Sequence, residues 1–260
     1  MIEKVNQQQS LINNNTYKAA LTGCLLGDSS FEKTFINVMH SIKNRDYVEF
    51  KYTEFSKFFN VGKIGISNNW GSNQDEALRK AVRFRILRDL SKQRYDLDYF
   101  YNILLSKSNP KKRCIPVDYL DELLTPLALL FWFMDDGQFI VRHPTKTYSL
   151  FRRRLAITLN SFDDADVLKT VEFINNKYGI NFKIERNKDK TNIVRIYVSS
   201  ATEIFKFLEL LYEFNEIIPK SMLYKFQPHF TEREFERIIK GCSTTIERVK
   251  EINDISFRTE

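Results

Sequence analysis

Two apolar segments of this chain end in the same way, at a carboxylate followed by a small residue. The first is LTGCLLGDS at residues 21–29, and the second is LLFWFMDDG at residues 129–137. Each predicts about two turns of buried helix that stop at an acid, Asp28 in the first and Asp136 in the second. A carboxylate there faces the negative end of the helix dipole, at a cost of a few tenths to about 1 kcal/mol. A divalent cation shared by the two ends would offset this cost.

The first of these helices is expected over residues 17–28, because Asn15 or Thr16 can serve as its N-cap. It contains two glycines, Gly23 and Gly27, which lie four residues apart and so share one face. Glycine inside a helix costs roughly 1 kcal/mol relative to alanine. We therefore expect the backbone of another element to approach this face closely.

The second helix has clearer boundaries. Thr125 is a good N-cap, and Pro126 fits the first helical position, where its missing N–H does no harm. Residues 127–136 are apolar on every side, which predicts a helix that is buried all round. Gly137 is expected to end it in a left-handed conformation.

Elements with other periods follow each helix. In the first half, period-two alternation predicts strands at residues 47–53 and 81–87, and residues 95–105 are expected to form an amphipathic helix, whereas 55–74 give no clear assignment. In the second half we expect a strand at 155–159, a helix at 162–178 capped by Ser161, a hairpin of 181–186 with 193–198, and a helix through 214 capped by Ser200 and Glu203.

The two halves also share an Ile-Pro dipeptide: Ile115-Pro116 and Ile218-Pro219 follow the last helix expected in each half. We therefore divide the chain into a polar leader (1–14), a first half (15–118), a second half (119–230) and a charged extension (231–260) that is expected to be helical. The two apolar segments then occupy corresponding positions in two related units.

The paired segments resemble the motifs of the LAGLIDADG homing endonucleases and maturases. The phrase LTPLALLFWFMDDG at residues 124–137 is similar to the second motif of single-chain members encoded by organellar group I introns. The resemblance implies an α+β fold of two pseudo-symmetric αββαββα units, with antiparallel, saddle-shaped sheets that bind DNA. It places the two motif helices together at the central interface.

The resemblance also implies the roles of individual residues. The metal-binding acids correspond to Asp28 and Asp136, and Asp135 leaves the position of the second acid open. Similar enzymes place basic residues beside the acids, which here gives Arg113 or Lys112 and Lys225 as further catalytic residues. Carboxylates hold Mg²⁺, or another divalent ion such as Mn²⁺, which can activate water and neutralise charge on phosphate.

The excess of basic residues agrees with a polyanionic partner, because 40 Lys and Arg against 33 Asp and Glu give a net charge of +7. Basic and apolar residues alternate at positions 83–86, and a two-stranded ribbon fits the major groove. The candidate DNA-binding residues are Lys51, Arg83, Arg85, Arg88, Arg152, Arg153, Arg154, Lys183, Arg186, Lys188, Lys190 and Arg195. Each could also be an ordinary solvated residue of a strand face.

Other residue types exclude several classes of protein. Three scattered cysteines predict no disulfide framework and a reducing compartment. His40, His143 and His229 lie far from any second ligand in the sequence, so we expect no zinc site. The chain lacks a signal peptide and a membrane span, which predicts an intracellular protein, either mitochondrial and organelle-encoded or from bacterial or phage cytoplasm.

Three functions remain open from the sequence. The leading hypothesis is a monomeric, site-specific endonuclease that hydrolyses both strands of double-stranded DNA at a long target site. The first alternative is a maturase that binds intron RNA and assists group I splicing. The second is a DNA-binding regulator that does not cleave, although such a protein is expected to lack an acid or its basic neighbours.

Overall fold

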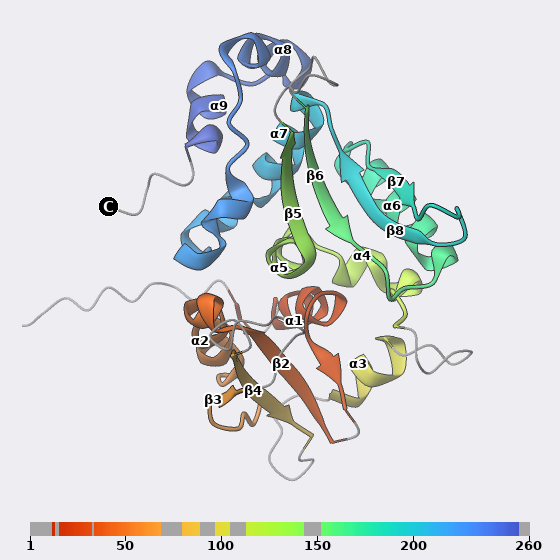
Figure 1. The fold of residues 1–260 in the computed structure, drawn as a ribbon, viewed down its shortest axis with the longest axis vertical. Coiled ribbons are helices and arrows are strands. Elements are labelled where there is room, and N and C mark those ends of the chain that lie inside the picture. Colours follow the sequence, from red (N-terminus) through yellow and green to blue (C-terminus); the bar gives the residue numbers. More distant parts are fainter. Residues whose placement is uncertain are drawn as a thin grey trace, which may run out of the picture.

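Two helices that lie side by side, α1 (Tyr17–Leu26) and α5 (Pro126–Asp136), form the centre of the computed structural model (Figure 1). The structure describes residues 12–13, 16–32, 34–68, 80–88, 97–104, 113–142 and 152–254. The two helices contain the acid-ended segments and are called the motif helices below. Residues 127–134 of α5 are at most 2% exposed, which confirms that this helix is buried on every side.

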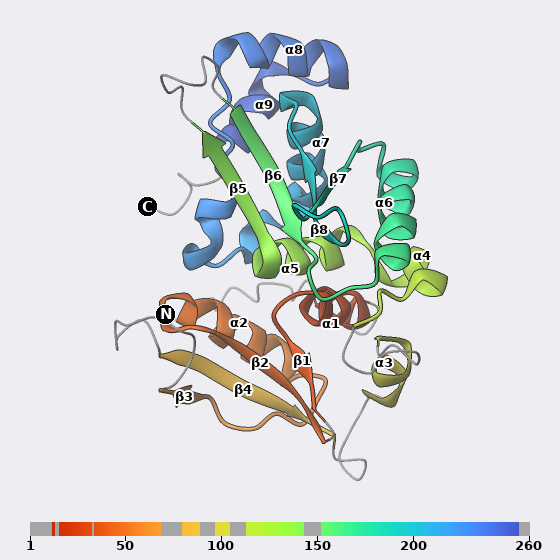
Figure 2. The ribbon, with the colours of Figure 1, turned by 45° about the vertical axis from the view of Figure 1, so that its right-hand side comes forward.

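A four-stranded antiparallel sheet lies in each half of the molecule. The N-terminal sheet has the order β1-β2-β4-β3, and the C-terminal sheet has the order β5-β6-β8-β7 (Figure 2). Corresponding strands therefore occupy the same place in both sheets. The strands are β1 (Ser30–Phe31), β2 (Phe35–Ser41), β3 (Gly65–Ser67), β4 (Ala81–Leu87), β5 (Gly137–Arg142), β6 (Arg152–Thr158), β7 (Lys183–Arg186) and β8 (Ile193–Val198).

Helices complete the repeat, since one follows the second strand of each half and another follows the fourth. In the first half these are α2 (Arg45–Phe55) and α3 (Leu97–Leu104), and in the second half α6 (Asp164–Tyr178) and α7 (Ala201–Leu211). This order confirms the α+β class and the two αββαββα units. Shorter helices are η1 (Ile42–Asn44), η3 (Val117–Tyr119), α4 (Leu120–Leu123), η4 (Tyr212–Ile217) and η5 (Lys220–Phe226).

The motif helices approach each other closely at two glycines, of which Gly23 meets backbone and Gly27 meets a side chain. A Cβ atom added at Gly23 would lie 2.3 Å from the carbonyl oxygen of Ala128. One added at Gly27 would lie 2.3 Å from the Cβ of Asp135. Neither position has room for a side chain, so the close approach expected from the spacing of these glycines is confirmed.

Residues 47–53, predicted as a strand, belong to helix α2, so that prediction is wrong. The buried side chains of α2 are Tyr47, Val48, Lys51 and Phe55. Their spacing follows the 3.6-residue period and places them on one helix face. A lysine on that face hid the period in the sequence, because lysine is almost never fully buried unless it is paired.

Two predicted helix ends also differ from the structure. Gly137 has φ −74° and ψ 150°, so it is extended and begins β5 instead of ending α5 in a left-handed conformation. Asp163, not Ser161, caps α6 by accepting a hydrogen bond from the backbone N–H of Ala165. Because β5 follows α5 directly, the acid at the end of this helix is held between two regular elements.

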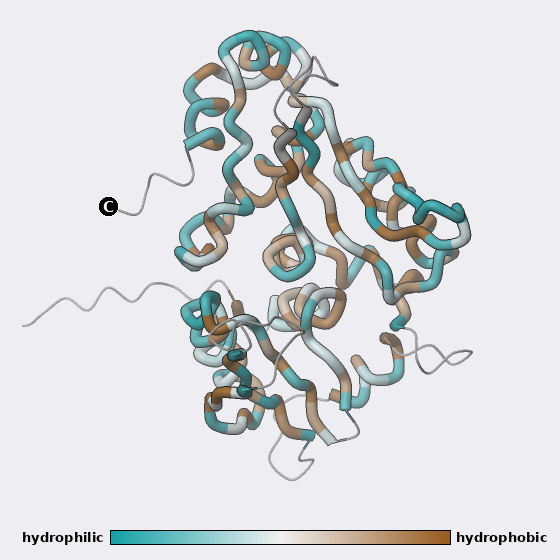
Figure 3. The backbone as a smooth tube through the Cα atoms, viewed as in Figure 1, coloured by the Kyte–Doolittle hydropathy of each residue, from teal (hydrophilic) through white to brown (hydrophobic). Residues whose placement is uncertain are grey.

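The C-terminal extension contains α8 (Glu232–Cys242) and α9 (Ile246–Asn253), which pack against α7. Arg153 of β6 links it to the sheet by donating to the carbonyl of Pro228 at 2.8 Å and to the carboxylate of Glu234 at 2.7 Å. Figure 3 shows that α8 and α9 are largely hydrophilic, whereas α5 is largely hydrophobic. Within the described ranges, no helix is long and apolar enough to cross a membrane.

Candidate active site at the ends of the motif helices

The two motif acids stand at neighbouring helix ends in different surroundings. Asp28 lies just beyond α1 with 45% of its side chain exposed, whereas Asp136 is the last residue of α5 and is half-buried. Burial raises the pKa of Asp136 to about 7, and the charges of Asp28 and Asp135 act in the same direction. Burial acts to raise the pKa of Asp28 as well, but the hydrogen bond from His40 and nearby positive charges outweigh it and lower that pKa.

The sequence did not decide whether Asp135 or Asp136 is the second metal-binding acid. In the structure, the Asp135 side chain is buried and bonded to other protein groups. Its Oδ1 accepts hydrogen bonds from Lys51 Nζ and from the Tyr47 hydroxyl, both at 2.7 Å. Its Oδ2 accepts from the backbone N–H of Asp28 at 3.1 Å. Both carboxylate oxygens are therefore engaged, and the Lys51 ammonium compensates the charge. Among the described residues, Asp136 forms no ion pair.

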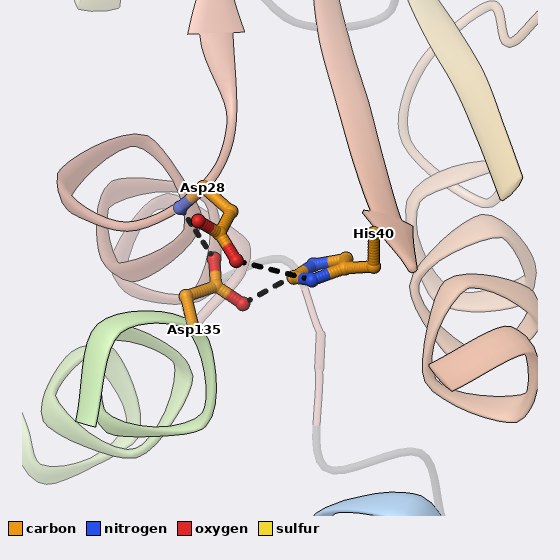
Figure 4. A group of neighbouring side chains, drawn as sticks. All are labelled: Asp28, His40 and Asp135. Atoms are coloured by element: carbon orange, nitrogen blue, oxygen red, sulfur yellow. Dashed lines mark hydrogen bonds and ion pairs between the residues drawn. The ribbon is translucent and has the colours of Figure 1, made fainter. Parts of the chain in front are cut away.

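His40 of β2 lies beside the carboxylates of both Asp28 and Asp135 (Figure 4). Its Nδ1 is 3.1 Å from Oδ2 of Asp28, and its Nε2 is 3.4 Å from Oδ1 of Asp135. The three residues form a group with ligand atoms within 4.8 Å of one another. The expectation that His40 lies far from any second ligand is therefore wrong. A signal was present, because the buried residues of β2 alternate and His40 continues the series of Ile36 and Val38.

Two basic side chains close the C-terminal ends of the motif helices. Arg113 donates through Nη1 to the carbonyl oxygens of Leu25, at 3.1 Å, and Gly27. Lys225 donates through Nζ to the carbonyl oxygens of Met134, at 2.6 Å, and Asp135, at 2.9 Å. Positive charge is favourable at both places because the helix dipole is negative there.

Burial lowers the pKa of Arg113 and of Lys225, and the surrounding carboxylates oppose this shift. Both residues therefore lie beside the motif acids, where the sequence analysis expected its basic catalytic residues. Lys112, the alternative to Arg113, lies outside the described residues.

A family model covers most of this arrangement. Residues 18–205 match the LAGLIDADG DNA endonuclease family, a range that includes both motif helices and both sheets. The chain belongs to this family. The resemblance based on the two acid-ended segments is thereby confirmed, and enzymes of the LAGLIDADG family use divalent metal ions.

Solved structures share the fold of this LAGLIDADG chain. The homing endonuclease I-WcaI, bound to its DNA recognition sequence, has a TM-score of 0.59 at 22% identity, over 84% of this chain and 87% of that one. The I-SmaMI LAGLIDADG homing endonuclease, bound to cleaved DNA, has a TM-score of 0.55 at 16% identity, over 96% and 97%.

Among curated relatives, protein RecA of Mycobacterium shimoidei is 28% identical over 132 residues. The match covers 48% of this chain and only 29% of the length of RecA. The RecA of Mycobacterium leprae (strain TN) is 25% identical over 124 residues, which are 17% of its length. About half of the LAGLIDADG chain therefore matches a minor part of these larger proteins.

Two candidate DNA-binding residues of the sequence analysis are wrong for that role. Lys51 is completely buried and bonded to Asp135. Arg153 is 4% exposed and is bonded to the C-terminal extension. A buried guanidinium or ammonium with internal partners cannot reach a phosphate or base edge without breaking them.

The other candidates that the structure describes lie at the surface or partly exposed. Arg83 and Arg85 lie on the face of β4 opposite the core, and Arg88 pairs with Asp98 at 2.5 Å. Lys183 of β7 is exposed, as are Lys188 and Lys190 in the turn that follows. The half-buried candidates of the second half pair with acids: Arg154 and Arg195 with Glu185, and Arg186 with Asp164. The side chain of Arg152 is not among those described.

Proposed function

We propose that this LAGLIDADG chain is a monomeric, site-specific homing endonuclease that cuts both strands of a long double-stranded DNA target with Mg²⁺ or Mn²⁺. The observation that carries the proposal is the position of Asp28 and Asp136 at the adjoining ends of two packed helices. One chain supplies both helices and two similar sheets, so it can approach both strands without a second copy. The solved structures of I-WcaI and I-SmaMI are of enzymes bound to DNA, which supports the same class of substrate.

The donor set fits a hard divalent cation. Asp136 has a raised pKa and no direct ion pair among the described residues, so a cation beside it would relieve its repulsion with the neighbouring acids. Asp28 is partly exposed and can hold a cation for the other strand, and carboxylate oxygens are the ligands that Mg²⁺ prefers. A bound divalent ion supplies an activated water and neutralises charge on the phosphate.

The basic residues have separable roles in this proposal. Lys225 donates two of its three N–H bonds to the end of α5, which leaves one to orient a water or a phosphate oxygen. Arg113 is held by Ser161 through Nε and Nη2 and binds the end of α1 through Nη1. We infer that Arg113 mainly fixes the helix end beside Asp28, whereas Lys225 lies closer to the reacting atoms.

A cleavage assay tests the proposal. Its substrate is DNA in which the two sequences that flank this reading frame in its genome are joined, with scrambled DNA as a control. We expect a discrete double-strand cut with Mg²⁺ and none with EDTA. Asp28→Asn and Asp136→Asn should each lower the rate of double-strand cleavage by roughly a thousandfold, because metal catalysis contributes several kcal/mol.

Binding must be measured beside cleavage. Both variants should still bind the target in Ca²⁺ by electrophoretic mobility shift, since the sheets are unchanged. Wild-type cleavage by either variant would contradict the two-acid mechanism. Binding of intron RNA with faster splicing and no DNA cleavage would show a maturase, and specific DNA binding without a cut would show a regulator.

A further inference from the structure

A buried series of polar groups links Asp135 of α5 to Asp28 at the end of α1, through side chains of the first half. Asp135 of α5 accepts from Lys51 of α2 at 2.7 Å, and Lys51 Nζ lies 3.0 Å from Nε2 of His40. Nδ1 of His40 then lies 3.1 Å from the Asp28 carboxylate. Lys51 is completely buried and His40 is 3% exposed, so water has little access to these contacts. This series of contacts ends at the carboxylate of Asp28, which we assign to metal binding.

The order of donors in this series follows from the chemistry of lysine. An ammonium group has three N–H donors and no acceptor. Nε2 of His40 must therefore accept from Lys51, which leaves the ring proton on Nδ1. That proton points to Oδ2 of Asp28. His40 thus offers Asp28 a hydrogen-bond donor whose tautomer and orientation are set by a buried partner.

The second half contains no such series at the corresponding positions. His40 stands five residues before the start of α2, and the residue five before α6 is Leu159, which is 1% exposed. Lys51 is the seventh residue of α2, and the seventh of α6 is Thr170, whose hydroxyl donates within its own helix to the Asp166 carbonyl. The position of Asp135 in the motif corresponds to Gly27 in the first helix, which has no side chain.

We propose that His40 is the positioning residue of Asp28, oriented by Lys51, and that the two motif acids are therefore held by different means. This inference rests on the metal role of the acids proposed above. A hydrogen bond from a buried neighbour fixes which oxygen of a carboxylate faces a metal, and loss of such a partner typically lowers metal affinity about 10- to 100-fold. Asp136 does not depend on this partner, so the cut made beside Asp28 can be slowed separately.

A set of three substitutions separates positioning from packing. His40→Leu installs the residue found at the corresponding place in the second half and removes the donor. His40→Asn keeps an N–H near the position of Nδ1 and should retain metal binding at Asp28. Val38→Ala, in the same buried row of β2, lowers stability by a cavity without touching Asp28 and serves as the control.

Two readouts require no DNA target. In ¹⁵N NMR spectra, only three histidines contribute signals, and His40 should show the Nδ1–H tautomer in the metal-free wild type. In a titration with Mn²⁺ followed by electron paramagnetic resonance, His40→Leu should weaken binding roughly 10-fold or more. His40→Asn and Val38→Ala should remain within about threefold of the wild type, with thermal melting recorded for all variants.

The third readout is strand-resolved cleavage of the target found by the assay above. His40→Leu should accumulate nicked DNA, because one strand is cut slowly and the other at the normal rate. An Nε2–H tautomer, wild-type Mn²⁺ binding by His40→Leu, or losses that track melting temperature in all three variants would overturn the inference. If the wild type cuts no DNA but His40→Leu weakens Mn²⁺ binding, the positioning role stands and the proposed cleavage fails.

Discussion

The two sheets of the molecule present their arginines in different ways. On the N-terminal sheet, the structure shows no carboxylate within ion-pair distance of Arg83 or Arg85 among the described residues. On the C-terminal sheet, Glu185 lies 3.4 Å from Arg154 and 3.6 Å from Arg195. The same residue type is therefore free to neutralise phosphates in one half and already oriented by an acid in the other. Net charge alone does not show which arginines contribute to affinity and which to specificity.

In the interior, it is the first half that contains the interacting polar side chains. Beneath Asp28 the first half buries a histidine, a tyrosine and a lysine, whereas the corresponding places in the second half hold Leu159, Asp166 and Thr170. The side chain of Asp166 is used elsewhere, since it accepts from the backbone N–H of Ile115. The two halves therefore share one backbone topology, whereas the surroundings of the two acids differ.

The largest expected effect comes from breaking the buried ion pair between Lys51 of the first half and Asp135 of the second. Asp135→Asn removes the carboxylate that compensates Lys51, and an uncompensated buried charge costs about 3–5 kcal/mol. Chemical denaturation should show a loss of unfolding free energy of this order. The change Asp166→Asn in the second half should cost much less, because among the described residues Asp166 pairs with no buried cation. Equal losses would contradict the asymmetry.

The two motif acids should respond to pH in opposite directions in the metal-free protein. Asp136 has a folded pKa near 7, above its unfolded value of 3.8, so its contribution to stability is present below about pH 4 and lost as the pH rises through 7. Asp136→Asn should therefore be more stable than the wild type at pH 8, by at most about 4 kcal/mol, and close to it at pH 4. Thermal melting in EDTA measures this difference.

Asp28→Asn supplies the matched comparison. The lowered pKa of Asp28 means that its contribution is present above its unfolded value and lost as the pH falls through the folded one. Asp28→Asn should accordingly be less stable than the wild type at pH 8. If both variants shifted the melting temperature in the same direction at pH 8, the different surroundings of the two acids would have no energetic consequence.

A smaller loss of stability is expected from a substitution at the contact between the two motif helices. Gly23→Ala places a Cβ against the Ala128 carbonyl and should cost about 1–3 kcal/mol, although alanine favours a helix. Gly65→Ala in β3 is the control, because apart from its chain neighbours no atom of the described residues lies within 4 Å of its added Cβ. Differential scanning calorimetry compares the two. An unchanged melting temperature for Gly23→Ala would show that the motif helices do not pack as described.

These features differ in how far the sequence could reveal them. The motif helices were predictable because an apolar helix with an acid at its end has few possible environments, and because glycines on one face imply a close neighbour. The role of Lys51 was not, because its partner Asp135 is 84 residues away along the chain. The role of His40 was partly predictable. Alternation along β2 indicated that its side chain is buried, but the sequence could not show which carboxylate it contacts.

The smallest expected effect concerns the difference between the two sheet faces. Arg85→Ala should reduce the slope of log affinity against log salt by about 0.9, as expected for one lost phosphate contact. Arg154→Ala should change the slope by less, because Glu185 already neutralises part of its charge, and should instead relax preference at one target position by about 1–3 kcal/mol. Binding is measured in Ca²⁺ at several salt concentrations, with single-base target variants. If Arg154→Ala changed the salt slope as much as Arg85→Ala and left base preference intact, the pairing with Glu185 would not distinguish the two faces.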